Sequence, residues 1–146
     1  MTVTFLPLTP PGIPRVLDYM AQLYESGGYD EDRQRKAIEG LFANPESGGI
    51  WLVHADGNRV GYLVLTIGYS LEFHGRYVLL DEIFLDAAWR NHGIGSQALA
   101  FAERWTRARG CQALSLEVGH HNPGALRLYR RCGFAAPDRH LLTKAL

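Results

Sequence analysis

A chain of 146 residues with 47% apolar and 21% charged side chains is long enough to bury one core and too apolar to be disordered as a whole. Its 15 lysines and arginines balance 15 acidic residues, so no net field points to nucleic acid or a membrane surface as a partner. The two cysteines lack metal-ligand spacing, and no apolar stretch approaches the ~20 residues of a membrane span. With no basic leader segment, the sequence predicts a cytoplasmic protein that binds no metal.

Hydrophobic periodicity and turn residues divide the chain into strands and helices. A first helix begins near Pro14, and Asp30 is expected to cap a second one. The expected strands are 3–8, 50–54, 59–69, 76–86, 113–118 and 139–145, and the expected helices are 14–24, 30–42, 96–109 and 122–132. Without an internal repeat or a linker, this order predicts a single α/β (α+β) domain over residues 1–146, with a mixed sheet flanked by helices.

A glycine-bearing turn, Arg90-Asn91-His92-Gly93-Ile94-Gly95-Ser96, connects the strand 76–86 to the helix 96–109. The first amides of a helix have no intrahelical acceptor and carry a partial positive charge, so this turn can bind a pyrophosphate. Gly93 and Gly95 allow the backbone to approach the phosphates, and Arg90 adds a full positive charge. The alternative is that the glycines only shape the connection.

The turn also satisfies the dinucleotide fingerprint G-x-G-x-x-G/A over residues 93–98, and Glu117 ends the next strand where a ribose-binding carboxylate would lie. An NAD- or NADP-dependent enzyme is therefore a remote alternative. It is disfavoured because too little chain follows the motif to complete a doubly wound sheet and a substrate domain.

A second motif, N-x-x-A-x-x-L-Y-x-x-x-G-F, is present over residues 122–134, and the turn at 90–95 matches Q/R-x-x-G-x-G/A. The two motifs in this order resemble the GNAT superfamily of acyl-CoA-dependent N-acetyltransferases. The resemblance implies a GNAT-like fold with a mostly antiparallel, twisted sheet, and acetyl-CoA as co-substrate. It implies turn amides at the pyrophosphate, strand backbone along the pantetheine arm, and Tyr129 near the thioester sulfur. The residues implied at the cofactor are Ile83, Phe84, Leu85, Arg90, Asn91, His92, Gly93, Ile94, Gly95, Ser96, Asn122 and Tyr129.

Acetyl transfer to an amine needs a base, because a protonated amine has no lone pair. Asp81 and Glu82 lie in an otherwise apolar strand just before the expected pantetheine segment. Neighbouring strand residues face opposite sides, so we expect Glu82 to be the base, with Asp81 as its substitute or electrostatic partner; a bulge would exchange their faces. The alternative is one surface acid and one buried acid paired with arginine. Tyr129 is expected to protonate the leaving thiolate, unless its ring only packs on the sheet.

Acids interleaved with aromatic residues in the first half of the chain suit a cationic acceptor. The expected acceptor-binding residues are Tyr24, Tyr29, Tyr69 and Glu72. The sequence thus predicts an enzyme that moves the acetyl group of acetyl-CoA directly to a primary amine of a small cationic molecule. A protein N-terminal or lysine acetyltransferase and a non-catalytic acyl-CoA-binding module stay open as alternatives. The family resemblance also makes a homodimer a reasonable expectation.

Overall fold

The computed structural model describes residues 1–146, and its elements follow the predicted order as far as the last helix. The strands are β1 (Val3–Pro7), β2 (Gly48–Ala55), β3 (Asn58–Ser70), β4 (Gly75–Leu85) and β5 (Leu114–Leu116). The helices are α1 (Ile13–Leu23), α2 (Glu31–Ala43), α3 (Ile94–Ala108) and α4 (Pro123–Arg131). Short 3₁₀ turns lie at Pro10–Gly12, Pro45–Ser47 and Ala87–Trp89. None of the helices combines the length and the apolar character needed to span a bilayer.

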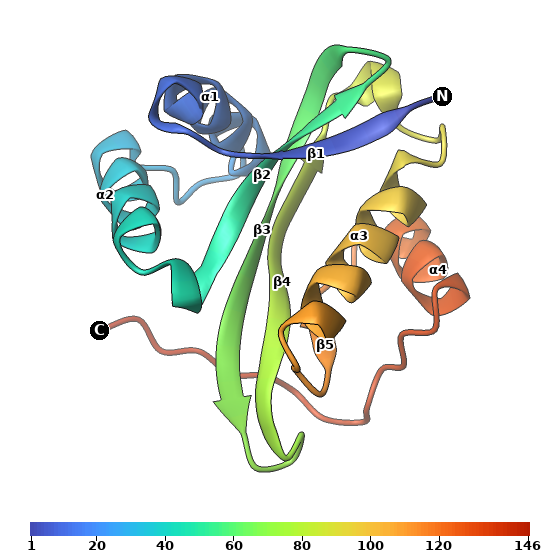
Figure 1. The fold of residues 1–146 in the computed structure, drawn as a ribbon. Coiled ribbons are helices and arrows are strands. Elements are labelled where there is room, and N and C mark those ends of the chain that lie inside the picture. Colours follow the sequence, from blue (N-terminus) through green and yellow to red (C-terminus); the bar gives the residue numbers. More distant parts are fainter.

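The strands form one sheet in the order β1-β2-β3-β4-β5. Neighbours from β1 to β4 are antiparallel, and β5 is parallel to β4. Helices α1 and α2 cover one face of the sheet, and α3 and α4 cover the other (Figure 1). The predicted mixed, mostly antiparallel sheet flanked by helices is therefore confirmed.

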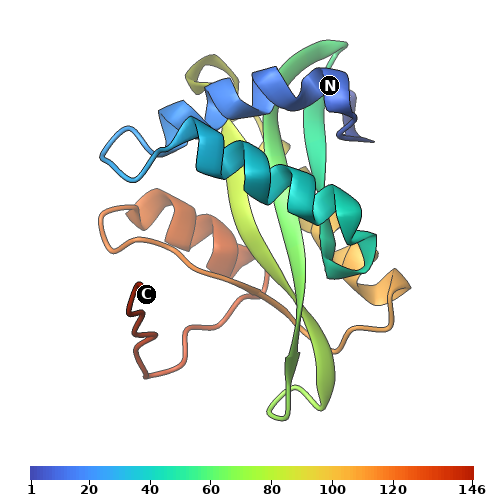
Figure 2. The ribbon, with the colours of Figure 1, turned by 90° about the vertical axis from the view of Figure 1, so that its left-hand side faces the viewer.

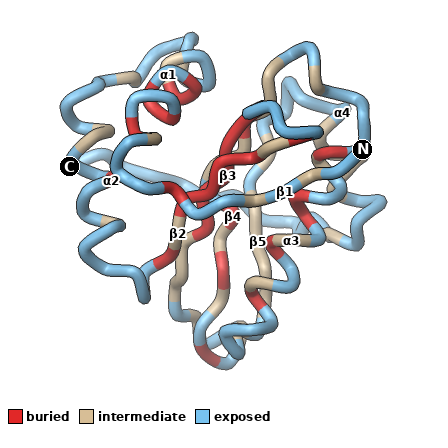
Figure 3. Tube along the Cα trace, turned by 45° about the horizontal axis from the view of Figure 1, so that its top comes forward, coloured by how far each residue is buried: buried red, intermediate tan, exposed pale blue.

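Two clusters of buried apolar side chains hold these layers together, one on each face of the sheet. The cluster under α1 and α2 includes Leu17 and Tyr62, and the cluster under α3 includes Leu63 and Ile94, all nearly inaccessible to water. Figure 3 shows the buried residues following the strands and the inner sides of the helices. Each such side chain stabilises the fold by roughly 1.5–3 kcal/mol relative to an exposed one, so the sheet is anchored from both sides.

Two helices begin at the predicted caps. The Asp30 carboxylate accepts a hydrogen bond from the Arg33 amide at 3.1 Å, which satisfies one of the free amides at the start of α2. The Asn122 side-chain oxygen accepts from the Ala125 amide at 3.2 Å, and Pro123 occupies the first position of α4. Local side-chain chemistry therefore sets both helix starts.

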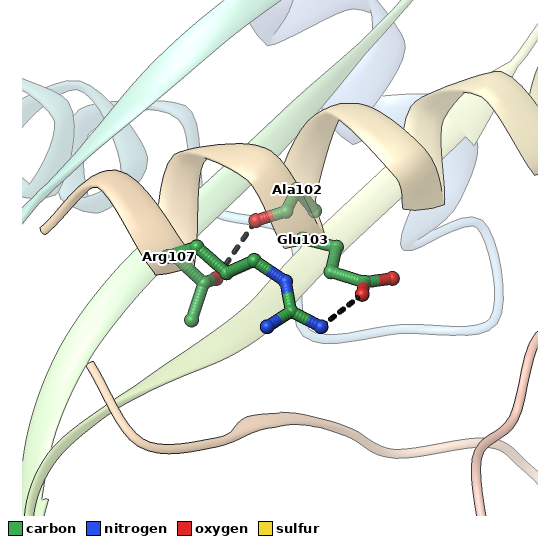
Figure 4. Close-up of polar contacts among 4 residues, drawn as sticks. Ala102, Glu103 and Arg107 are labelled. Carbon is green, nitrogen blue, oxygen red and sulfur yellow. Dashed lines mark hydrogen bonds and ion pairs between the residues drawn. The ribbon is translucent and has the colours of Figure 1, made fainter. Parts of the chain in front are cut away.

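Helix α3 carries its own polar contacts near its C-terminus (Figure 4). The Arg107 guanidinium lies 2.7 Å from the Glu103 carboxylate, one turn earlier. The Thr106 hydroxyl, which is buried, donates to the Ala102 carbonyl oxygen at 2.7 Å. With its buried hydroxyl satisfied, α3 provides a regular support for the turn at its other end.

The C-terminal segment corrects one prediction, because no strand forms over residues 139–145. The side chains of Leu141 and Leu142 are 73% and 88% exposed, and as neighbours they could not both face a core. Instead, Arg139 makes two hydrogen bonds, of 2.7 and 2.8 Å, to the Glu72 carboxylate between β3 and β4. One side-chain contact thus holds the segment, and the outer edge of β5 stays unpaired.

The close approach of β3 and β4 at Gly61 yields a stability prediction. A methyl group there would collide with the Phe84 carbonyl oxygen. We expect Gly61→Ala to lower the free energy of unfolding by about 1–3 kcal/mol, measured by urea denaturation. Gly40→Ala is the matched control, since its methyl group meets no atom within 4 Å and α2 should gain up to about 1 kcal/mol. Equal effects of the two substitutions would contradict the packing described here.

Candidate active site

A β-bulge in β4 decides where the two acids of this strand point. Val64 pairs with Glu82 and Leu65 pairs with Leu80, so Asp81 is the extra residue opposite β3. Before the bulge, the even-numbered residues Val78 and Leu80 pack against the α3 side of the sheet. After it, the odd-numbered residues Ile83 and Leu85 do so. Asp81 and Glu82 therefore both face α1 and α2, and the expectation that adjacent acids would face opposite sides is wrong.

Both acids line a cavity of about 360 Å³, which we call the α1–α2 cavity. Its lining residues are Met20, Gln34, Ala37, Ile38, Gly40, Leu41, Asn44, Ser47, Ile50, Val64, Thr66, Asp81 and Glu82. The walls are largely apolar, and the polar groups apart from the two acids are amides and hydroxyls. A concave site of this size with a few convergent polar groups is typical of small-molecule binding.

Glu82 is held in place by a buried tyrosine. The Tyr62 hydroxyl donates a hydrogen bond of 2.8 Å to the Glu82 carboxylate, and the Tyr62 ring packs against the rings of Tyr19 and Phe84. Burial raises the pKa of Glu82 from its ordinary value near 4.5 to about 7. Burial, together with the charge of Asp81, also raises the pKa of Tyr62, which therefore stays protonated as a donor. A carboxyl group tuned to neutral pH suits general base catalysis.

Asp81 lies beside Glu82 but has no partner of its own. Its side chain is exposed, and it forms no hydrogen bond or ion pair with another side chain. Surrounding protein atoms raise the pKa of Asp81, and the nearby carboxylate of Glu117 raises it further. The site thus contains a second acid whose negative charge is uncompensated.

Beyond the bulge, β4 has a free edge on the side of β5. Strand β5 pairs only with the part of β4 before the bulge, and the chain then leads away to α4 (Figure 2). The Asp86 amide donates to the Val60 carbonyl oxygen, so Asp86 points its backbone groups toward β3. Along a strand the backbone groups of successive residues alternate between the two neighbouring sides, so those of Phe84 also point toward β3. Those of Ile83 and Leu85 point to the free edge, where an extended ligand can pair as an added strand.

The turn before α3 presents backbone amides without partners. Gly93 has a left-handed conformation, with φ of 80°, and α3 begins at the next residue. Unlike α2 and α4, α3 has no side-chain cap. It also has no acid in its first turn. The His92 ring nitrogen Nδ1 lies 2.7 Å from the Arg90 carbonyl oxygen, within the turn. The free amides and the helix dipole fit the predicted anion site.

The Arg90 side chain turns back from this turn toward β4. Its Nε donates to the Leu85 carbonyl oxygen at 2.9 Å, and its guanidinium lies 5.6 Å from the centre of the Phe84 ring. Arg90 thus binds one of the two carbonyl oxygens, those of Ile83 and Leu85, that point outward from the free edge. Its contact with a pyrophosphate stays a prediction and requires that it leave Leu85.

Tyr129 lies on the other face of the sheet from Glu82. It packs on the α3 side with its ring 6.1 Å from the ring of Phe134, and burial raises its pKa, so the hydroxyl keeps its proton at neutral pH. It lines a larger cavity, of about 710 Å³, between α3, β5, α4 and the C-terminal segment. Since neither acid of β4 lines that cavity, the smaller α1–α2 cavity is the candidate acceptor site.

The structure does not bring the expected acceptor-binding residues together. Tyr24 and Tyr29 pack against the cluster under α1 and α2, where the Tyr29 hydroxyl donates to the Leu17 carbonyl at 3.2 Å. Tyr69 is 73% exposed, and Glu72 holds the C-terminal segment. None of the four lines the α1–α2 cavity.

Several residues of the site carry no recognisable signal of their own in the sequence. Tyr62 reads as one more apolar position in a strand, and only its register with Glu82 reveals the contact. Gln34 on α2 and Thr66 on β3 carry no motif. The one available signal was that Gln34, Ala37, Ile38 and Leu41 share one face of a helix at 3.6-residue spacing.

The fold is an α/β fold with a largely antiparallel sheet. The free edge of β4 lies beside the uncapped start of α3, and this combination suits a long anionic cofactor. The particular family follows from comparison. Residues 14–134 match the Acetyltransferase (GNAT) family, and the chain belongs to this family.

Individual relatives agree with this assignment. An uncharacterized N-acetyltransferase of Methanocaldococcus jannaschii is 31% identical over 87 residues, 59% of this chain but only 38% of that protein. An aminoglycoside N(6')-acetyltransferase of Stenotrophomonas maltophilia is 24% identical over 119 residues, 75% of this chain and 74% of that protein. A solved aminoglycoside N-acetyltransferase in complex with CoA has a TM-score of 0.82 at 19% identity, over 99% of this chain and 95% of that one, which shows the shared fold.

The buried carboxyl group of Glu82 predicts a pH-dependent stability. Because its pKa rises from 4.5 to about 7 on folding, this group costs stability as the pH increases across that window. We expect Glu82→Gln to exceed the wild type in free energy of unfolding above pH 7, by on the order of 2 kcal/mol, and the gain to fade toward pH 4. Urea denaturation at several pH values measures it. Glu39→Gln, at an exposed acid of α2, is the control; parallel pH profiles for Glu82→Gln and the wild type would refute the assignment.

Proposed function

We propose that this chain transfers the acetyl group of acetyl-CoA directly to a primary amine of a small cationic molecule. The observation that carries the proposal is the Glu82 carboxyl group, half-buried in the α1–α2 cavity at the bulge where the free edge of β4 begins. Membership in the GNAT family and the names of the aminoglycoside acetyltransferase relatives support an amine acceptor.

The residues around the free edge fit acetyl-CoA, which supplies the thioester carbonyl when it is bound. The amides of residues 91–96 would hold the pyrophosphate, with Arg90 as a mobile positive charge. The backbone groups of Ile83 and Leu85 would pair with the pantetheine arm. Asn122 would contact the cofactor from the start of α4, while its side-chain oxygen stays with the cap.

The chemistry divides between groups on the two faces of the sheet. Glu82 accepts the proton of the bound ammonium group, which frees the nitrogen lone pair to attack the thioester carbonyl carbon. An outward amide of β4 stabilises the negative charge that develops on the carbonyl oxygen. As the carbon–nitrogen bond forms and the carbon–sulfur bond breaks, Tyr129 donates its proton to the departing sulfur. The second proton, which the nitrogen loses as the neutral amide forms, returns through solvent to the Tyr129 oxygen. Asp81 supports the positive charge of the acceptor.

Three alternatives from the sequence receive less support. The α1–α2 cavity, at about 360 Å³, suits a small molecule better than a protein segment. A purely cofactor-binding module does not explain a buried carboxyl group with its own tyrosine donor. An NAD- or NADP-binding fold needs a largely parallel, doubly wound sheet, whereas only β5 is parallel to its neighbour here.

A homodimer is a further part of the proposal. The outer edge of β5 is unpaired, and the exposed side chains of Leu141 and Leu142 lie on the segment that follows α4. Unpaired strand edges favour association with another chain. Both features support pairing between two copies through this side of the molecule.

Cofactor binding and turnover are tested together. A ligand at 100 times its dissociation constant stabilises a protein by about 2.7 kcal/mol, so acetyl-CoA should raise the melting temperature by several degrees. NAD and NADP should not. We expect Glu82→Gln and Tyr129→Phe to keep this shift while release of free CoA in the presence of an amine falls by at least about 100-fold. A melting shift with acetyl-CoA, but no release of CoA by the wild type above the uncatalysed rate, would favour the non-catalytic module. Unchanged turnover in both variants would exclude Glu82 and Tyr129 as catalytic residues.

The hydrogen bond from Tyr62 makes a separate prediction for the pH profile. The donor favours the charged form of Glu82, so Tyr62→Phe should raise the pKa of Glu82 further. The acid limb of kcat/KM against pH should move upward by about one unit. Tyr19→Phe is the matched control, because Tyr19 belongs to the same ring stack but donates to Asp86. A profile that does not move in Tyr62→Phe would exclude Glu82 as the base.

A further inference from the structure

The α1–α2 cavity has an unusual balance of charge. It contains two carboxyl groups, from Asp81 and Glu82, and none of its other lining residues is a lysine, arginine or histidine. Neither acid belongs to any ion pair of the protein, since the three ion pairs involve other residues on the surface. The carboxylate of Glu117 lies close enough to Asp81 to add to the negative potential. The charged groups of the cavity are thus all acidic, and no lining residue supplies a counter-charge.

In the free protein Asp81 is exposed and Glu82 is half-buried. An acceptor that fills the cavity displaces water from both acids, so it must itself supply the missing cation. A single ammonium group cannot satisfy both acids during the reaction. The nitrogen that attacks must first give up its proton to Glu82, and it then carries no positive charge for Asp81. A second, unreactive ammonium group in the same acceptor would keep Asp81 paired through the whole reaction.

We infer that the acceptor is a small diamine, with Asp81 binding the ammonium group that does not react and Glu82 deprotonating the one that does. The inference rests on the proposed function and adds the substrate class. Because the bulge places adjacent residues on one face, the two amines should be separated by only a few bonds. The apolar walls, among them Ile38, Leu41 and Val64, would contact the carbon skeleton between and beside the amines.

The same charge balance acts against other amines. An acceptor that carries a carboxylate or a phosphate beside its amine would place a negative group among two or three acids. The amides of Gln34 and Asn44 and the hydroxyls of Ser47 and Thr66 can only donate neutral hydrogen bonds to such a group. Free amino acids and phosphorylated amino sugars are therefore excluded as good acceptors.

Three matched amines test the inference through the release of free CoA. Propane-1,3-diamine, propylamine and β-alanine share a three-carbon skeleton and differ in the group at the far end: ammonium, methyl or carboxylate. With the wild-type protein we expect kcat/KM to be at least about tenfold higher for the diamine than for propylamine, and lowest for β-alanine. In Asp81→Asn the ratio of diamine to propylamine should fall toward one. In Asp81→Lys, β-alanine should overtake the diamine.

Glu39→Gln serves as the control, because it removes one negative charge from an exposed position of α2 outside the cavity, and it should keep the wild-type ratio. A melting curve of each variant with acetyl-CoA confirms that the fold and the cofactor site are intact. Equal kcat/KM for diamine and propylamine in the wild type, or an equal loss for both in Asp81→Asn, would overturn the inference while leaving the acetyltransferase function in place. Absence of any shift with acetyl-CoA would instead overturn the proposed function itself.

Discussion

One inserted residue in β4 is the constraint on which the candidate site depends. Without the bulge at Asp81, the strand would continue in register with β3, and its two acids would face opposite sides of the sheet. With it, Asp81 and Glu82 face the same cavity, and the pairing between β4 and β5 ends at the same point. A bulge bends its strand and increases the local twist. A single backbone irregularity therefore accounts for both the acidic cavity and the open edge beside it.

The site is arranged at the expense of local stability. Glu82 and Tyr62 place a carboxyl group and a hydroxyl group in a region otherwise filled by apolar side chains, and their mutual hydrogen bond offsets only part of the desolvation. The aromatic stack of Tyr19, Tyr62 and Phe84 fixes the geometry, because the rings leave Tyr62 no room to rotate away. Active sites commonly contain buried polar groups that lower the stability of the fold.

The sequence predicted what is encoded locally. The helix starts at Asp30 and Asn122 follow from side chains that cap the next few amides, and the turn before α3 follows from its glycines. What it could not predict depends on register between distant segments. The bulge, the contact between Tyr62 and Glu82, and the polar residues that α2 presents to the cavity appear only when strands and helices are aligned in space.

The C-terminal segment is a second feature that the sequence alone does not predict correctly. The segment His140-Leu141-Leu142-Thr143 resembles a strand, but a strand exists only where a neighbouring edge accepts its backbone groups. Here Arg139 is bound by Glu72, no strand edge pairs with the segment, and the leucines that follow stay in solvent. Whether such a segment becomes a strand therefore depends on contacts between residues far apart in the sequence.

The position of Arg90 has a consequence for the protein before any ligand arrives. An open strand edge is a template on which strands of other molecules can assemble, and it is a common origin of aggregation. By donating to the Leu85 carbonyl oxygen, Arg90 covers part of that edge with a positive charge. Asp81 places a negative charge at the other end of the same stretch. Charges thus flank this open stretch of β4 at both ends, which disfavours pairing with a strand of another molecule.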